Sequence, residues 1–138
     1  MIKLIFAISV FLFLGSPFAN AEQVYYCASE LNAGIIKDKK TGKWRKGNFA
    51  EERYTIKFND EYTSLRGLHK GMPWTCIKPY QGIFPDALTC IDKNNNGDFF
   101  SFDRKGLIFV LGRGSVNGFL FPIAKTEVEL IAGDCESF

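Results

Sequence analysis

The chain has 138 residues, which is the size of one domain. Its 17 basic and 15 acidic side chains give a formal net charge of +2, and this near-neutral balance argues against nucleic acid as the main partner. Aromatic residues make up 15% of the chain, so we expect a substantial apolar core.

The N-terminus has the three parts of a signal peptide. Lys3 supplies positive charge, residues 4–14 form an apolar run, and residues 19–21 (Ala-Asn-Ala) form an A-x-A cleavage site. The run is shorter than the roughly 20 residues that a membrane span requires. We therefore predict that residues 1–21 are cleaved and that residues 22–138 form one exported domain, either periplasmic or secreted.

All four cysteines follow the predicted cleavage site, at Cys27, Cys76, Cys90 and Cys135. An even number in an exported domain of this size predicts two disulfides. A metal site has less support, because no two cysteines have C-x-x-C spacing and the chain has one histidine. Of the three possible pairings we favour Cys27–Cys135, which ties the two ends together, and Cys76–Cys90, which closes a local loop.

Short β-type runs follow one another along the chain. The first two are residues 23–28 and 34–37, with a break expected at 32–34. The clearest run is residues 53–59, in which Tyr54, Ile56 and Phe58 alternate with polar residues. The other expected strands are 62–68, 74–78, 87–91, 98–104, 107–111, 116–121 and 127–132.

These runs, separated by turn signals, predict an all-β domain of about eight or nine short strands, because no window has a convincing helical apolar stripe. We expect a small antiparallel β-barrel or sandwich with two disulfides, and closure into a barrel would also protect the strand edges. Residues 90–112 should form the central meander and turn at Asn96-Gly97. Phe100 and Phe102 should face the core, and Asp98 should face solvent.

Residues 37–46 hold six basic residues and one acid, with Thr41-Gly42 as the expected hairpin tip. Clustered cations beside an aromatic ring can engage anionic polymers or lipid headgroups. The candidate ligand-binding residues are Lys39, Lys40, Lys43, Trp44 and Arg45. The alternative is a solvated hairpin whose lysines protect an exposed strand edge.

Residues 92–103 partly match a calcium-binding loop, with oxygen donors, a glycine and a final acid at the required positions. The candidate ligands are Asp92, Asn94, Asn96, Asp98 and Asp103. Phe100 occupies the ninth position, where it supplies no ligand, and the flanking segments are β-like rather than helical. We therefore favour a plain hairpin with no cofactor and keep calcium as the alternative.

Enzymatic activity has the least support of the functions considered. His69 is the one histidine, and no neighbouring motif supplies the partner that a catalytic histidine needs. Residues 112–118 lack the lysine and the spacing of a phosphate loop. A hydrolase could still use carboxylates among Asp92, Asp98 and Asp103.

Both ends of the mature chain resemble a group of small exported four-cysteine bacterial proteins of unknown function. The similar stretches are residues 24–27 (Val-Tyr-Tyr-Cys) and 132–138 (Ala-Gly-Asp-Cys-Glu-Ser-Phe). More distantly, a cysteine near each end of a small exported β-barrel resembles the C-type lysozyme inhibitors. The Ser-Gly-x-x-Tyr-type loop of that family has no match here, so no site residue carries over.

These observations favour an exported, non-enzymatic binding module for a small ligand or an envelope protein. The alternative is an inhibitor of a lysozyme-type hydrolase. An apolar cavity inside the barrel would favour the first function, and a protruding loop would favour the second. Neither a nucleic-acid partner nor a membrane-spanning segment is expected.

Overall fold

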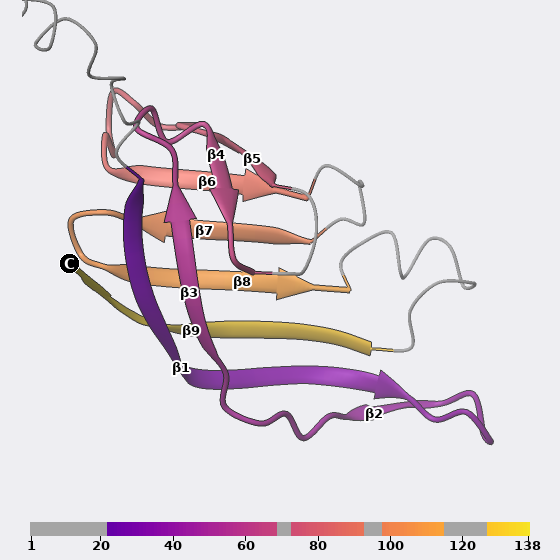
Figure 1. Ribbon diagram of the computed structural model, residues 1–138. Helices are drawn as coiled ribbons and strands as arrows, with labels where there is room; N and C mark the ends of the chain where they lie inside the picture. The colour runs from indigo at the N-terminus through magenta and orange to yellow at the C-terminus, as the bar shows by residue number, and fades with distance from the viewer. Residues whose placement is uncertain (1–21, 69–72, 93–97, 115–126) are drawn as a thin grey trace, which may run out of the picture.

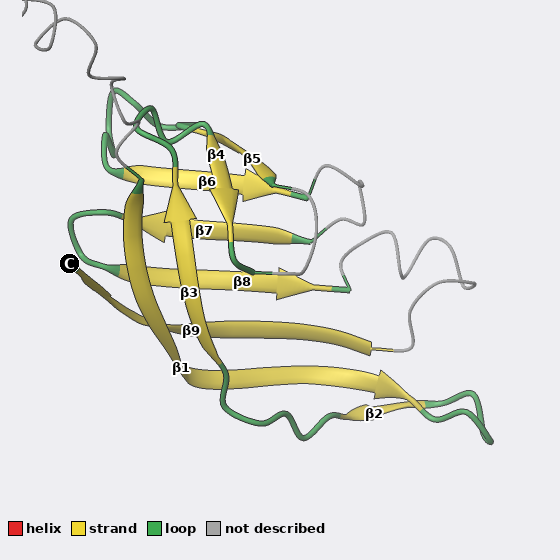
Figure 2. Cartoon of the chain, in the orientation of Figure 1, coloured by secondary structure: helices red, strands yellow, loops and turns green. Residues whose placement is uncertain are grey.

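The computed structural model describes residues 22–68, 73–92, 98–114 and 127–138. Within these ranges the chain forms nine strands and no helix. Figures 1 and 2 show the strands wrapping around one interior. The strands are β1 (Gln23–Lys37), β2 (Trp44–Lys46), β3 (Arg53–Phe58), β4 (Ser64–Arg66), β5 (Trp74–Ile77), β6 (Ala87–Ile91), β7 (Phe99–Asp103), β8 (Ile108–Arg113) and β9 (Glu127–Ser137).

The strands close into an antiparallel barrel. Each strand from β3 to β9 pairs with its neighbour in sequence, and β1 pairs with both β3 and β9. Eight strands therefore form the barrel, and β2 pairs with the far end of β1 outside it. The predicted all-β barrel with two disulfides is confirmed.

Strand β1 lies between its two barrel neighbours, because residues 25–28 pair with β3 on one edge and with β9 on the other, and it bends beyond them. Its pairing with β9 changes register between Ser29 and Leu31, and such a bulge increases the local twist of a strand. Opposite the bulge lies Gly133, where a Cβ atom would collide with the Ala28 carbonyl oxygen. The bent strand then continues past the barrel to β2 (Figure 1). The break predicted at residues 32–34 is wrong, because the chain stays extended through it.

Aromatic rings pack the barrel interior. The four most central phenylalanines are at most 2% exposed: Phe58, Phe100, Phe102 and Phe109. Phe102 stacks on both Phe58 and Phe100, with ring centroids 5.7 Å and 6.1 Å apart. Phe100 stacks in turn on Phe109 at 5.6 Å. The predicted inward orientation of Phe100 and Phe102 is confirmed, and these rings occupy the centre of the barrel.

Both favoured disulfides are present, Cys27–Cys135 and Cys76–Cys90. In each bridge the two cysteines lie directly opposite each other on neighbouring antiparallel strands, with Cα atoms 4.0 Å and 3.9 Å apart. The repeated Thr-Cys-Ile segment explains the second bridge. Its two copies pair antiparallel, and this pairing aligns their central cysteines.

Asp98 does not face solvent as predicted. It is 4% exposed, and its Oδ1 accepts a hydrogen bond from the Gly114 amide at 2.8 Å. A buried carboxylate requires a hydrogen-bond donor. The Asp98 side chain therefore points inward, where it accepts a hydrogen bond from the backbone amide that follows β8. The predicted signal peptide (residues 1–21), His69, the predicted Asn96-Gly97 turn and the expected strand 116–121 lie outside the described residues.

Loss of the Cys27–Cys135 bridge should lower the stability more than loss of Cys76–Cys90. The two bridges span 108 and 14 residues, for which loop entropy predicts contributions of about 4.7 and about 3 kcal/mol. Urea unfolding of the Cys27→Ala/Cys135→Ala and Cys76→Ala/Cys90→Ala variants measures both losses. A larger loss from the Cys76 variant would contradict this ranking.

Candidate functional site

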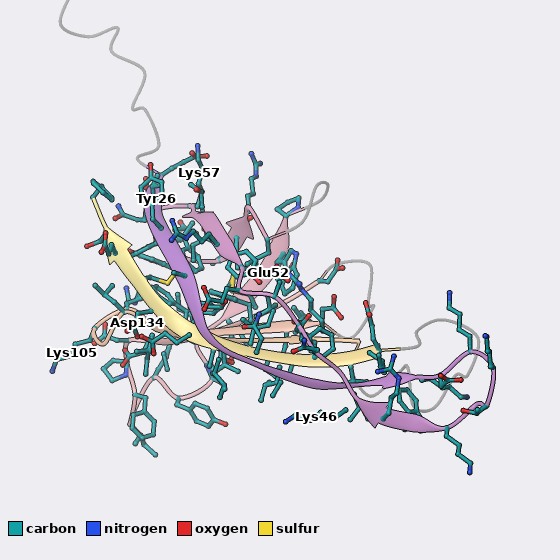
Figure 3. All side chains as sticks on the ribbon, turned by 90° about the horizontal axis from the view of Figure 1, so that it is seen from below. Tyr26, Lys46, Glu52, Lys57, Lys105 and Asp134 are labelled. Carbon is teal, nitrogen blue, oxygen red and sulfur yellow. A yellow bond between two sulfur atoms is a disulfide. The ribbon has the colours of Figure 1, made fainter. Side chains whose placement is uncertain are left out.

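Strands β1 and β2 form a hairpin arm that extends beyond the barrel (Figures 1 and 3). Residues 35–37 pair with residues 44–46. Asp38 shapes the turn between them, because its Oδ1 accepts hydrogen bonds from the Lys40 and Thr41 amides at 2.9 Å and 2.8 Å. Gly42 has a φ of +68°, which confirms the predicted hairpin tip. We call residues 37–46 the basic arm.

The basic arm carries six bases and one acid, a net charge of +5 against +2 for the whole chain, so the rest of the chain is net −3. The hydrogen bonds from Thr41 and Lys40 lower the pKa of Asp38 and hold its carboxylate in the turn. The five candidate ligand-binding residues lie together on this arm and are all exposed: Lys39, Lys40, Lys43, Trp44 and Arg45. The structure therefore gathers the predicted basic site on one projecting element.

The outer surface of the barrel, from β5 round through β9 to β1, carries two neighbouring rows of outward side chains without a charge. The first row is Ile77, Thr89, Ser101, Val110, Ala132 and Leu31, and the second is Ile91, Phe99, Gly112, Leu130 and Ala33. We call this surface the apolar wall. Leu31, Ile77, Ile91 and Leu130 are 50–64% exposed. Singly exposed apolar residues are ordinary, but a contiguous apolar surface indicates an interface.

The connection between β5 and β6 carries a second apolar surface. Three large side chains on it are exposed: Tyr80, Ile83 and Phe84. The Phe84 amide donates a hydrogen bond to the Tyr80 carbonyl at 2.7 Å, and the two rings meet edge to face at 6.3 Å. An Arg104–Asp86 ion pair of 2.9 Å holds the base of the loop. The loop is therefore an ordered projection with an apolar tip.

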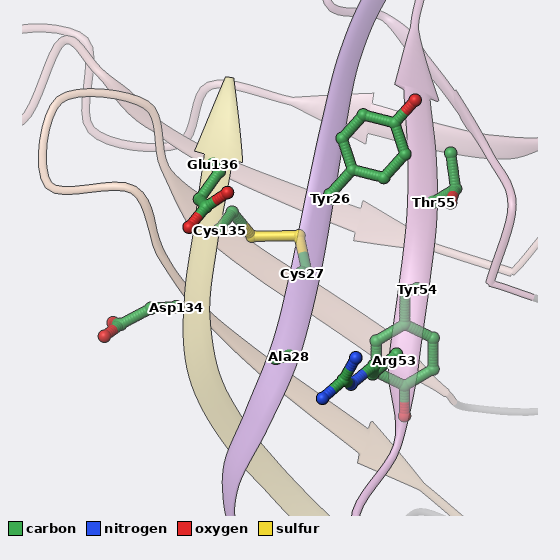
Figure 4. A pocket seen from close by; sticks show the side chains of 9 residues that line it. All are labelled: Tyr26, Cys27, Ala28, Arg53, Tyr54, Thr55, Asp134, Cys135 and Glu136. Atoms are coloured by element: carbon green, nitrogen blue, oxygen red, sulfur yellow. A yellow bond between two sulfur atoms is a disulfide. The ribbon is translucent and has the colours of Figure 1, made fainter. Parts of the chain in front are cut away.

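A depression of about 540 Å³ crosses β9, β1 and β3 (Figure 4). Ala28 lies at its centre, directly between Arg53 on β3 and Asp134 on β9. Tyr26 and Glu136 also line it, so it offers an aromatic face together with charges of both signs. These groups suit a small polar molecule better than an apolar one.

A charge cluster that the sequence did not predict joins β3, β8 and β9. Arg113 donates hydrogen bonds to both carboxylate oxygens of Glu52 at 2.7 Å and 2.9 Å. The hydroxyl of Tyr54 donates to the same carboxylate at 2.7 Å, and Glu129 lies 3.5 Å from Arg113. Ser29, at the β1 bulge, positions Glu52 by accepting its amide hydrogen bond at 2.8 Å.

The two carboxylates of this cluster differ in exposure, because the Glu52 side chain is 35% exposed and the Glu129 side chain 8%. Glu129 is 7% exposed, and burial raises its pKa although Arg113 acts in the opposite direction. Its Oε1 has no hydrogen-bond partner among the described residues. Perturbed acids occur both in catalytic sites and in structural ion-pair networks. Because one arginine binds both carboxylates here, the arrangement is that of a structural network.

Replacing Glu129 with Gln should change how stability depends on pH. The pKa of Glu129 in the folded protein lies above the ordinary glutamate value of 4.5. At a pH just above 4.5, the folded protein therefore binds more protons than the unfolded chain. Wild-type stability should therefore fall as the pH rises through this window, and the Glu129→Gln variant should lack that fall. Thermal melts across the mildly acidic range test this. A variant that is less stable by the same amount at every pH would contradict it.

The structure separates the candidate calcium ligands. Asp98 precedes β7 and Asp103 ends it, so about 17 Å of strand lies between them at ~3.4 Å per residue. Asp92 lies close to Asp98, since its amide bonds the Asp98 carbonyl at 3.4 Å. Asn94 and Asn96 lie outside the described residues. Within the described part of the chain, no three His, Cys, Asp or Glu side chains gather as a metal site requires.

Comparisons with known proteins add no assignment. The chain matches no protein-family model, no curated protein and no solved structure. No helix in the described ranges has the length and apolarity needed to cross a bilayer. The resemblances to exported four-cysteine proteins and to C-type lysozyme inhibitors stay predictions, as does calcium binding, and the function is argued from the surfaces described above.

Proposed function

We propose that the protein is an exported, non-enzymatic binding module that uses its basic arm to bind an anionic ligand. The observation that carries this proposal is the concentration of six bases on one projecting hairpin, where the single acid is held in the turn. Several cations on one exposed element attract a polyanion far more strongly than they attract separate small anions. The two disulfides are compatible with export.

The position of the lysines favours ligand binding over protection of a strand edge. Strand β2 has three residues, of which Arg45 and Lys46 are basic, so two cations suffice to protect its free edge. Lys39, Lys40 and Lys43 lie in the turn, beyond the paired residues. The turn has no free strand edge, so protection of an edge does not explain these three cations.

The packed interior also favours a surface site. Among the described residues, stacked and buried phenylalanine rings occupy the part of the interior where a small-ligand pocket could lie. A binding module of this kind therefore presents its ligand sites on the outer surface. Exposed charges interact over about 8 Å at physiological salt, so binding by the arm should depend on ionic strength.

Dextran sulfate is a suitable probe of this proposal. The mature protein should bind it, and the Lys39→Gln/Lys40→Gln/Lys43→Gln variant should bind at least tenfold more weakly, because three of the six arm cations are removed. Affinity capillary electrophoresis at several salt concentrations measures the loss. Lys105→Gln, at the other end of the molecule (Figure 3), is the control and should leave binding unchanged. Equal binding by the triple variant would refute the proposal.

The apolar loop favours a second candidate function, inhibition of a lysozyme-type hydrolase. Its exposed Ile83 and Phe84 form a tip that could enter an enzyme cleft, as protruding inhibitor loops do. The mature protein should then slow cell-wall lysis by a C-type lysozyme, and Ile83→Ser/Phe84→Ser should abolish the inhibition. Lysis rates that do not change at a molar excess of the protein would exclude this candidate.

A further inference from the structure

We infer that the anionic ligand of the basic arm is the surface of a lipid bilayer, and that the apolar wall enters the headgroup region beside the arm. The inference rests on the proposed function and adds the class of ligand. Its structural basis is that Lys37 and Lys46 of the arm, together with Trp44, share one face of a continuous sheet with the uncharged rows of the barrel.

Strand β1 carries this continuity, because it runs from the barrel wall into the arm. Ile35 pairs with Val128 of β9 on one side and with Lys46 of β2 on the other. Val128 is two residues from Leu130 of the wall, a distance of about 7 Å along the strand. Paired residues share a face, so Lys46 points to the same side as the apolar wall.

Lys37 and Trp44 lie on this face as well. They are paired, and Lys37 is two residues beyond Ile35 on the same strand. The Lys37 ammonium lies 5.9 Å from the centroid of the Trp44 ring. Tryptophan and lysine next to an apolar surface are typical of proteins that lie in the membrane interface. The indole ring and the lysine stem contact the acyl boundary while the charged group reaches the phosphates.

The far end of the face has the opposite charge, and this sets an orientation. Asp103 and Asp134 flank Ile108 at the end of the wall away from the arm. Figure 3 shows Asp134 and Lys46 at well-separated places on the molecule. An anionic surface attracts the arm and repels the acidic end, so the barrel should bind with its arm end against the lipid.

The shape of the wall favours a bilayer over a second copy of the chain. The rows run around the outside of a closed barrel, so the surface is convex. Two rigid convex walls meet along a narrow strip, which is less than the ~800 Å² per partner of a stable interface. A fluid bilayer adapts to a convex surface. A soluble polyanion, in contrast, has no contact to offer to the exposed Leu31, Ile91 and Leu130.

Tryptophan fluorescence gives a direct readout of binding to vesicles. The chain has two tryptophans, and Trp74 is 2% exposed in the barrel whereas Trp44 is 38% exposed on the arm. Vesicles of phosphatidylcholine and phosphatidylglycerol in equal parts should shift the emission of the mature protein to shorter wavelength. Phosphatidylcholine vesicles alone should produce no shift, and Trp44→Phe should remove the shift while vesicle sedimentation still detects binding.

Two pairs of variants separate the charge contribution from the apolar contribution. Lys37→Gln should weaken vesicle partitioning about fivefold, since each cation near an anionic membrane contributes ~1 kcal/mol, and Lys105→Gln should not. Leu130→Ser should weaken it roughly tenfold by removing buried apolar area. Ile108→Ser is its matched control, because Leu130 and Ile108 are 50% and 53% exposed and only Ile108 lies at the acidic end.

Dextran sulfate distinguishes failure of this inference from failure of the proposed function. Leu130→Ser should bind dextran sulfate as the wild type does, because the polymer contacts only the arm. Binding of the polymer without binding of anionic vesicles would overturn the bilayer inference and leave the proposed function intact. Loss of both would overturn both. A dimer in light scattering that Leu130→Ser dissociates, without vesicle binding, would assign the wall to a second copy instead.

Discussion

The pairing of β1 with β9 is the interaction on which the rest of the structure depends. It joins the first and last strands over eleven residue pairs and closes the barrel, and Cys27–Cys135 fixes it covalently. Residues 25–28 pair with β3 and β9 at once, and beyond the bulge after Ser29 the strand stays paired with β9 and then pairs with β2 outside the barrel. The same strand therefore supplies both the closing edge of the barrel and the base of the basic arm.

Closure also determines where function can lie. A closed eight-strand barrel has an interior just wide enough for side chains, and here stacked phenylalanine rings occupy its centre. The proposed binding surfaces therefore lie on the outside of the barrel, and the fold divides that outer surface into parts. The outward residues of β3 are charged or polar, whereas most of those of β6 to β9 belong to the apolar wall, which Asp103 and Asp134 bound at one end. The arm lies where the apolar wall ends, so its cations border an uncharged surface.

Patterns in the sequence predicted those parts of the candidate site whose residues lie close together in the chain. The basic arm is ten consecutive residues, and its turn depends on Asp38, Thr41 and Gly42 within that stretch. The charge cluster could not be predicted in this way, because Arg113 and Glu52 are 61 residues apart and meet only after closure. The prediction that Asp98 faces solvent was wrong for a related reason, since its partner is the amide of Gly114, which follows β8 and is 16 residues away in the chain.

By itself, the sequence determined an all-β chain with two disulfides and a basic hairpin, because alternation, turn residues and charge density act over a few residues. Even the Cys76–Cys90 bridge follows from two copies of Thr-Cys-Ile that pair across one connection. Only the tertiary structure decided that β1 runs unbroken through a bulge, that four phenylalanine rings stack inside the barrel, and that Leu31, Ile91 and Leu130 lie on its outer surface. Those features depend on strand register around a closed barrel. Register sets which face each residue occupies, and no single segment of the chain contains that information.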